Sequence, residues 1–423
     1  MSIATESVRV SVREPETATT AKPELRVLQI FNSLAMGGAE TWLLSLLRYF
    51  QQAQDELPMK VRVDVILTSG AKAMFDDEAE SLGARLFYSH FTRKNIFTFA
   101  RDFRRILVEG RYHAIHDHQD YAAGFRFMIG HGRLPSVRVA HVHNTSIQVA
   151  GYNSSFLRRF TFARAKQFLA RSATHVTSTS QRMLTEFGFD DPYFNSISRS
   201  VVHCGFDVSS FRGNNAHLHR QLSEEFGWDD DAKIILFVGR LDDPAGPNLH
   251  RKRPDFALDV ARACIAHDPQ VRMIMAGSGQ RIRMKLESEV KTWGLADKIH
   301  LTGIYPDVTR LMLGSNVFLF PAIEEGLGMV VVEAQAAGLR VLTSTGVPQE
   351  SMVLPDIVEF KALEDGVSSW AKETLRLLNL PGPDSGACNS AVRDSAFSIE
   401  NSAKNLLEIY CGSLGTGTIA FPD

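Results

Sequence analysis

Short apolar runs alternate with longer amphipathic stretches along this chain, and this alternation is the feature that most constrains its fold. The first series opens with RVLQIF, GGAETWLLSLLRYFQQ, VRVDVILTS and MFDDEAESLGA. Buried strands of a parallel sheet read as continuous apolar runs, and each is joined to the next by a helix. The pattern therefore predicts a first domain of strand-helix-strand units over residues 25–210.

A second series of the same kind follows a polar interval. Residues 211–232 hold a glycine, paired asparagines and a short acidic helix candidate, a composition typical of an interdomain linker. The alternation resumes with IILFVGR, PDFALDVARACIAH and VRMIMAGSG and continues to residue 397. We therefore expect an α/β protein with two doubly wound sheets, and a ligand site in the cleft between the carboxyl ends of their strands.

The two ends of the chain are expected to lie outside these domains. Residues 1–24 are rich in Thr, Ser, Glu and Pro and lack aromatic side chains, which indicates a disordered tail. Residues 398–423 open with a helical pattern, SIENSAKNLLEIYCGS. We expect this last helix to pack back toward the first domain.

Composition excludes several classes of protein. Lys+Arg 46 against Asp+Glu 48 gives a formal net charge of -2, so no general basic field favours nucleic acid as a partner. The four cysteines are scattered without a C-x-x-C pair or a metal-ligand spacing, which is typical of a reducing compartment. No apolar run is long enough to cross a bilayer, and the N-terminus lacks the apolar stretch of a secretory signal. These features predict a cytoplasmic protein.

The first motif is Gly37-Gly38-Ala39-Glu40, between the first strand and the first helix. Glycines allow a sharp turn there, and the unpaired N–H groups at the start of a helix favour an anion. A tight turn without a ligand is the alternative. The G-x-G-x-x-G spacing of a dinucleotide-binding fingerprint is absent.

The second motif brings positive charge to the second domain. Gly239 and Arg240 directly follow the strand IILFV, and Arg251, Lys252 and Arg253 precede the helix FALDVARA. An arginine fork and a movable lysine at such positions can converge on a diphosphate. A solvated basic turn is the alternative for the triplet.

The third motif is EEGLGMVVVE, which follows the strand NVFLFPA. Gly326 and Gly328 bring main-chain amides to the start of a helix, and Glu325 can reach the same place from the loop. Glu333 lies in the helix among apolar residues, where a carboxylate requires hydrogen-bond donors such as a pair of vicinal hydroxyls. A helix cap with a salt-bridged glutamate is the alternative.

Histidines end two strands of the first domain. His116 and His118 lie on one face of AIHDHQD, and His141 and His143 do the same in VAHVHN. Such histidines can bind an anionic or hydroxyl-rich ligand, although a structural histidine is the alternative at each position. Paired histidines also bind zinc, but no third ligand stands at a recognisable spacing, so no metal is expected.

A basic and aromatic stretch covers residues 156–171, FLRRFTFARAKQFLAR. A helix of this composition can rest on an anionic membrane surface. Packing on one face with a solvated basic face on the other is an equal alternative.

Together these motifs resemble the retaining nucleotide-sugar glycosyltransferases of family 4, the group 1 glycosyltransferases, in their capsule and exopolysaccharide branch. The resemblance extends from GGAE through AHVHNT, VGR, AGSG and GLADKIHLTG to EEGLGMVVVEAQAAG and TSTGVP. Its most specific element is the E-x7-E pair of Glu325 and Glu333. The resemblance implies a GT-B fold, in which two Rossmann-like domains face each other and bind the acceptor (25–210) and the nucleotide sugar (233–397).

The resemblance also implies a role for each motif residue. Arg240 and Lys252 would hold the donor diphosphate, but the interval between them is longer than is usual in the family, so Arg251 and Arg253 stay open as alternatives. Glu325 would contact sugar hydroxyls and Glu333 the ribose. The expected catalytic set is His118, Arg240, Lys252 and Glu325; the further donor-binding set is Gly37, Gly38, Gly239, Ile304, Gly326, Leu327, Gly328, Met329 and Glu333; and the acceptor-binding set is His143 and Asn144.

The reaction implied is transfer of a sugar from a nucleoside diphosphate to an acceptor hydroxyl, with retention at the anomeric carbon and without a metal or cofactor. The expected acceptor is a glycan or a polyprenyl-linked glycan, and residues 156–171 would contact the inner face of the cell membrane. Two alternatives stay open: a nucleotide-sugar epimerase or hydrolase of the same architecture, and a non-catalytic sugar-binding assembly protein. The intact pair of Glu325 and Glu333 argues against the second.

Overall fold

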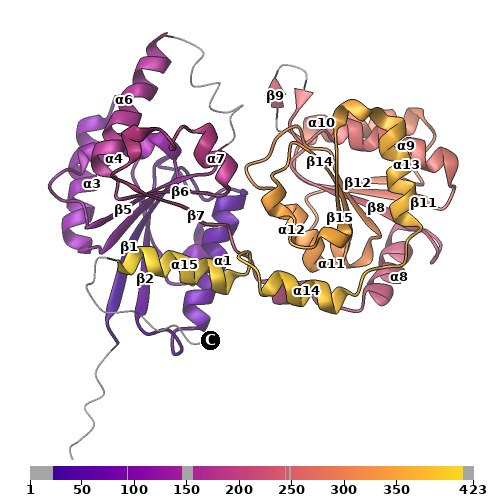
Figure 1. Cartoon of the computed structure of the whole chain (residues 1–423), viewed down its shortest axis with the longest axis horizontal. Coiled ribbons are helices and arrows are strands. Elements are labelled where there is room, and N and C mark those ends of the chain that lie inside the picture. Colours follow the sequence, from indigo (N-terminus) through magenta and orange to yellow (C-terminus); the bar gives the residue numbers. More distant parts are fainter. Residues whose placement is uncertain (1–21, 93, 145–155, 243, 247–248, 413–423) are drawn as a thin grey trace, which may run out of the picture.

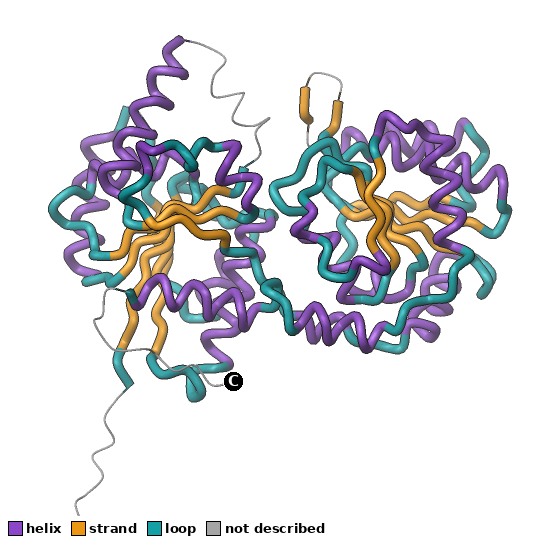
Figure 2. Tube along the Cα trace, viewed as in Figure 1, coloured by secondary structure: helices purple, strands orange, loops and turns teal. Residues whose placement is uncertain are grey.

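The computed structural model describes residues 22–92, 94–144, 156–242, 244–246 and 249–412. Figures 1 and 2 show two lobes, each with a central sheet covered by helices on both faces. The expected disordered tail lies outside the described residues, except for residues 22–24, of which Glu24 already belongs to the first strand.

The first lobe is built on a seven-stranded parallel sheet with the order β3-β2-β1-β4-β5-β6-β7. Its strands are β1 (Glu24–Phe31), β2 (Lys60–Leu67), β3 (Arg85–Tyr88), β4 (Ala114–Asp117), β5 (Val137–Val142), β6 (His175–Ser178) and β7 (Ser198–Val201). Its helices are α1 (Gly38–Gln52), α2 (Asp76–Ser81), α3 (Ile96–Gly110), α4 (Ala123–Ile129), α6 (Phe156–Ser172) and α7 (Gln181–Glu186). The strand order reverses between β1 and β4, so a ligand is expected beyond the carboxyl ends of these two strands.

The second lobe repeats this design with a six-stranded parallel sheet in the order β12-β11-β8-β13-β14-β15. Its strands are β8 (Lys233–Val238), β11 (Val271–Ala276), β12 (Ile299–Gly303), β13 (Val317–Phe320), β14 (Arg340–Ser344) and β15 (Val358–Lys361), and a small hairpin pairs β9 (Pro244–Gly246) with β10 (Leu249–His250). Its helices are α8 (Asn215–Phe226), α9 (Pro254–His267), α10 (Gln280–Thr292), α11 (Val308–Gly314), α12 (Met329–Ala336), α13 (Gly366–Leu378) and α14 (Ser385–Arg393). Its order reverses between β8 and β13.

The chain crosses between the lobes earlier than the sequence predicts. Val202 and Cys204 belong to the hydrophobic core of the first lobe, whereas Phe206 already belongs to that of the second. The predicted linker, 211–232, is instead part of the second lobe, because α8 packs on α11 with Leu222 fully buried. The polar composition of this segment hid a single apolar stripe, Leu218, Leu222 and Phe226, in which the residues are four positions apart.

The last helix, α15 (Ile399–Cys411), returns to the first lobe and packs on α1. Figure 1 shows the chain running from α14 under the second lobe to α15 under the first. Leu406, Leu407 and Tyr410 enter the core of the first lobe, and the indole nitrogen of Trp42 donates to Ser402 Oγ at 3.0 Å. The first lobe therefore contains residues from both ends of the described chain.

None of the helices in the described part of the chain combines the length and the apolar composition that a bilayer crossing requires.

The packing of α15 predicts the effect of one substitution. Leu406 is 1% exposed within the first lobe, so Leu406→Ala should cost about 2–5 kcal/mol and lower the midpoint of thermal unfolding. The matched control is Leu380→Ala, because Leu380 is 38% exposed and should tolerate the change. Equal midpoints for the two variants, measured by circular dichroism, would contradict this packing.

Candidate active site

The two sheets direct their carboxyl ends toward each other, and the lobes touch there. Ser180 follows β6, and its hydroxyl donates to the carbonyl oxygen of Gly326, which follows β13, at 2.7 Å. A methyl group on Gly326 would lie 3.1 Å from the carbonyl oxygen of His143, at the end of β5. The loop that carries EEGLG thus lies directly against the strand ends of the first lobe.

The GGAE motif places a carboxylate at the start of α1. Glu40 folds back over Gly37, where a Cβ atom would collide with its carboxylate, whereas Gly38 has open space around it. Burial raises the pKa of Glu40, and the charge of Arg240 in the other lobe lowers it. A side chain at position 37 would therefore displace the carboxylate of Glu40. In its present position, Glu40 faces a cation across the lobe boundary. Its place in the first turn of a helix, where acidic residues are favoured, is the signal for it in the sequence.

Gly239 and Lys252 form a close contact at the end of β8. A Cβ atom on Gly239 would lie 2.7 Å from Cδ of Lys252, so the aliphatic stem of the lysine lies across the glycine. Lys252 Nζ lies 2.7 Å from Glu325 Oε1 and 5.0 Å from the ring centroid of Phe320. The lysine thus links the end of β8 to the loop after β13.

The structure distinguishes Lys252 from its two arginine neighbours. Arg253 adopts a left-handed backbone conformation with φ 48°, and its Nε donates to Asp255 at 3.0 Å. Arg251 is 8% exposed, and its carbonyl oxygen accepts from the amide of Ile323 at 2.6 Å. Of the three residues, Lys252 forms the ion pair with Glu325.

Glu333 is the second carboxylate beside Lys252. It lies half-buried in α12, where burial raises its pKa to about 7 and the charge of Lys252 lowers it. A carboxyl group with this pKa is readily ionised by additional hydrogen-bond donors. Lys252 therefore acts on both members of the E-x7-E pair.

The other residues of the predicted donor site contribute in different ways. Gly328 precedes α12 with φ 84°, a conformation that favours glycine. The side chain of Leu327 is buried in the core of the second lobe, so it offers a ligand only its main chain. Met329 packs against the cores of both lobes, and Ile304, after β12, is 59% exposed.

The four histidines come together around the ring of Trp42 in α1. Burial lowers the pKa of each histidine, that of His143 to about 3. All four are therefore neutral at pH 7. His118 bonds through Nδ1 to His143 Nε2 at 2.8 Å and through Nε2 to Gln29 Oε1 at 2.7 Å. Both ring nitrogens of the predicted catalytic histidine are thus engaged within the lobe.

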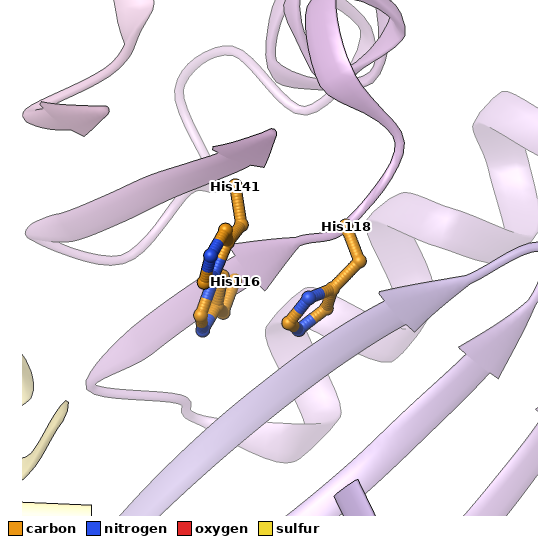
Figure 3. Close-up of side chains that lie close together, drawn as sticks. All are labelled: His116, His118 and His141. Atoms are coloured by element: carbon orange, nitrogen blue, oxygen red, sulfur yellow. The ribbon is translucent and has the colours of Figure 1, made fainter. Parts of the chain in front are cut away.

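His116, His118 and His141 form the group shown in Figure 3, with one nitrogen of each within 4.8 Å of the others. The fold thus supplies the third histidine that the spacing did not reveal. The rings of His116 and His118, however, are stacked with centroids 4.1 Å apart, and His116 Nε2 faces His141 Nδ1 at 3.2 Å. Imidazole lone pairs lie in the ring plane, so stacked rings do not point to a common ion. This geometry favours hydrogen bonds between the histidines over shared metal ligation.

Asn144, predicted to bind the acceptor, is held by Asp120. Its side-chain amide donates to the Asp120 carboxylate, which also accepts from the amide of His143 at 3.2 Å. Burial raises the pKa of Asp120 to about 6. Asp120, in the turn that follows β4, thus holds the end of β5 in place.

A separate depression of about 490 Å³ lies between α8, α11 and the segment after α13. Asn316 and Arg340, at the amino ends of β13 and β14, line it. It is therefore at the opposite edge of the sheet from Glu325.

Comparison with known families agrees with this geometry. Residues 36–210 match the model described as Glycosyltransferase Family 4, and residues 232–379 match that described as Glycosyl transferases group 1. The chain belongs to the family 4, group 1 glycosyltransferases.

Individual relatives extend over almost the whole chain. EpsF of Bacillus subtilis (strain 168), provisionally named as a glycosyltransferase, is 26% identical over 390 residues, which cover 91% of this chain and 96% of EpsF. Anabaena HepE, solved in complex with UDP-glucose, has a TM-score of 0.68 at 17% identity, with 91% of this chain and 98% of HepE covered. WaaG, a glycosyltransferase involved in lipopolysaccharide biosynthesis, has a TM-score of 0.63 at 16% identity, with coverage of 92% and 100%. These similarities confirm the predicted GT-B fold.

The position of Lys252 predicts a change in the titration of Glu333. Lys252→Met removes the positive charge that stabilises the carboxylate, so the pKa of Glu333 should rise above its value of about 7. The measurement is an NMR titration of the glutamate carboxyl carbons, assigned with Glu333→Gln. Arg253→Met is the control, because Arg253 is paired with Asp255. An unchanged pKa of Glu333 in Lys252→Met would show that the two groups do not interact.

Proposed function

We propose that this chain transfers a sugar from a nucleoside diphosphate sugar to a hydroxyl of a glycan acceptor, in polysaccharide biosynthesis. The observation that carries this proposal is the cluster of Lys252, Glu325 and Glu333 at the carboxyl ends of the second sheet, beside the strand ends of the first lobe. HepE, which has the same fold, was solved in complex with UDP-glucose.

Positive charge is required where the donor bond breaks. The leaving diphosphate gains negative charge in the transition state, so groups that contact it lower the barrier. Arg240, Lys252 and the amides of residues 326–329 would make these contacts, with the loop amides directed by the start of α12. Lys252 is paired with Glu325 in this structure, and the diphosphate would compete for its ammonium group.

The two carboxylates would bind the hydroxyl groups of the donor. Glu325 lies in the loop beside Lys252 and would accept hydrogen bonds from the sugar. Glu333, with a pKa of about 7, would accept from the vicinal hydroxyls of the ribose, which stabilise its ionised form. Ile304 and the turn at Gly303 would lie beside the base.

We propose that the reaction proceeds with retention and without a metal or cofactor. Cationic side chains and helix amides can take the place of a divalent ion at a diphosphate. The leaving group and the attacking hydroxyl would share one face of the sugar, in contrast to the paired carboxylates of retaining glycosidases.

The acceptor is proposed to be a glycan carried on a polyprenyl lipid at the inner face of the membrane. The support is α6, whose buried residues Ala165 and Leu169 pack inward while Phe156 is 86% and Phe160 51% exposed. Exposed aromatic rings among basic residues can enter the headgroup region of an anionic bilayer.

Two reactions on the same architecture are distinguished from transfer by simple assays. A nucleotide-sugar hydrolase or epimerase would form product without an acceptor. A non-catalytic sugar-binding protein would release no nucleoside diphosphate when donor and acceptor are both present.

Substitutions of the charged residues test the donor site. Arg240→Ala and Glu325→Ala should each lower kcat by about 10²-fold or more, because each removes a group that acts on the developing charge or on the sugar. The readout is release of nucleoside diphosphate with a panel of nucleotide sugars. Arg281→Ala, at an exposed position of α10, is the control and should retain full activity. Wild-type kcat in either site variant with an unchanged fold would reject the assigned site.

Vesicle binding tests the membrane surface. Replacing Phe156 and Phe160 with serine should reduce cosedimentation with vesicles of anionic phospholipid, because two exposed apolar side chains are lost. Tyr193→Ser removes another exposed ring, 46% exposed and outside α6, and should leave binding unchanged. Equal binding by all three proteins would exclude α6 as the contact.

A further inference from the structure

A continuous chain of hydrogen bonds runs through the first lobe beneath the active site. His143 Nε2 meets His118 Nδ1 at 2.8 Å, and His118 Nε2 meets Gln29 Oε1 at 2.7 Å. Gln29 Nε2 then meets the Tyr410 hydroxyl at 3.1 Å, and this hydroxyl meets His116 Nδ1 at 2.5 Å. The chain ends where His116 Nε2 meets His141 Nδ1 at 3.2 Å. Strands β1, β4 and β5, the residues that directly follow β4 and β5, and helix α15 contribute to it.

The orientation of the Gln29 amide group, with Oε1 toward His118 and Nε2 toward Tyr410, sets the direction of this chain. A neutral imidazole has one N–H donor and one acceptor nitrogen, so fixing one ring nitrogen fixes the other. Gln29 Oε1 can only accept, so His118 carries its proton on Nε2 and accepts at Nδ1 from His143 Nε2–H. Gln29 Nε2 can only donate, so Tyr410 accepts from it and donates its own proton to His116. Each residue thereby donates to the next, from His143 to His141.

This direction leaves one ring nitrogen available at the site. Nδ1 of His143 has no hydrogen-bond partner among the described residues and is not one of the buried unpaired atoms, so solvent or a ligand can reach it. His141 Nε2 is also unpaired, but it is buried. His143 directly follows β5, next to the position of Gly326 in the other lobe. Its open nitrogen is therefore an acceptor at the lobe boundary.

We propose that Gln29 and Tyr410 are positioning residues, which hold His118 and His143 in one tautomer so that His143 Nδ1 accepts a hydrogen bond from a hydroxyl group of the carbohydrate substrate. The proposal deepens the transferase function and rests on it for the identity of the ligand. A contact of His143 with substrate is already expected from the sequence, and the new element is that His118, Gln29 and Tyr410 fix the tautomer of His143. No proton is transferred in this contact.

The surroundings of the chain hold the rings in place. Phe31 stacks on His118 with ring centroids 4.1 Å apart, and Trp42 packs edge-on against His116, His118 and His141. Gln29, His116 and Tyr410 are all buried, so water does not compete for their hydrogen bonds. Loss of the Tyr410 hydroxyl can therefore alter the tautomer of His143 through Gln29 and His118.

Nitrogen-15 NMR of the histidine side chains tests the direction without any assay of activity. In the full chain, the spectrum assigned by His143→Asn should show His143 with a bare Nδ1 and a protonated Nε2, and His118 with the same tautomer. The opposite tautomer of His143, with its proton on Nδ1, would overturn the proposal directly.

Two variants test the coupling. Tyr410→Phe and Gln29→Leu should each turn the single tautomer of His143 into a mixture. Tyr410→Phe removes the hydroxyl that orients the Gln29 amide, and Gln29→Leu removes the amide oxygen that fixes the proton of His118. Tyr410→Phe should have no further effect in the Gln29→Leu background, since both changes act through one chain. Tyr49→Phe is the matched control: Tyr49 packs against the same core and lies outside the hydrogen-bond chain. A His143 tautomer that stays single in folded Tyr410→Phe would overturn the coupling.

Kinetics then test the contact with substrate. His143→Phe should lower kcat/KM by about 10-fold, the size of one neutral hydrogen bond, and Tyr410→Phe should lower it by less. The value of kcat/KM is measured once with the acceptor varied and once with the nucleotide sugar varied. A loss in only one of these measurements identifies the substrate whose hydroxyl is bound, and no loss in either would overturn the assignment. If the tautomers are as predicted but no sugar is transferred, the proposed function fails and the positioning chain stands.

Discussion

The contact between Gly326 and the strand ends of the first lobe is the constraint on which the whole candidate site depends. Ser180 donates to the carbonyl oxygen of Gly326, and a Cβ atom at position 326 would lie only 3.1 Å from the carbonyl oxygen of His143. The loop that carries Glu325 is therefore fixed from both lobes at once. Since the same contact brings His143 beside this loop, the predicted site residues of the two lobes lie next to each other.

Opposite charges are already matched across this region. Lys252 is paired with Glu325 and acts on Glu333, and the charge of Arg240 acts on Glu40 in the first lobe. Buried charges are costly unless such partners are present. When a dianionic diphosphate binds, its phosphate oxygens would replace these carboxylates as partners of Lys252 and Arg240. Before it binds, the carboxylates balance the two positive charges. The first lobe, in contrast, contributes His143, a neutral imidazole, which suits a hydroxyl group better than a phosphate.

Local patterns predicted the features that depend on neighbours in the sequence. Alternating apolar runs indicated both parallel sheets, and Glu325 and Glu333 were recognised by their fixed spacing. The apolar stripe of α8 was missed because three residues in a polar segment are a weak signal. The bond between His116 and Tyr410 could not be predicted, because 294 positions separate the two residues and only the completed fold brings them together.

The return of α15 has a consequence for how the protein is made. The core of the first lobe includes Ile399, Leu406 and Tyr410, which leave the ribosome only after the entire second lobe has been synthesised. Until then the nascent chain exposes the surface of α1 that these residues cover, and Gln29 and His116 lack their partner. Because synthesis runs from the N-terminus, the first lobe cannot complete its core until α15 has emerged, and the histidine side of the candidate site is completed last.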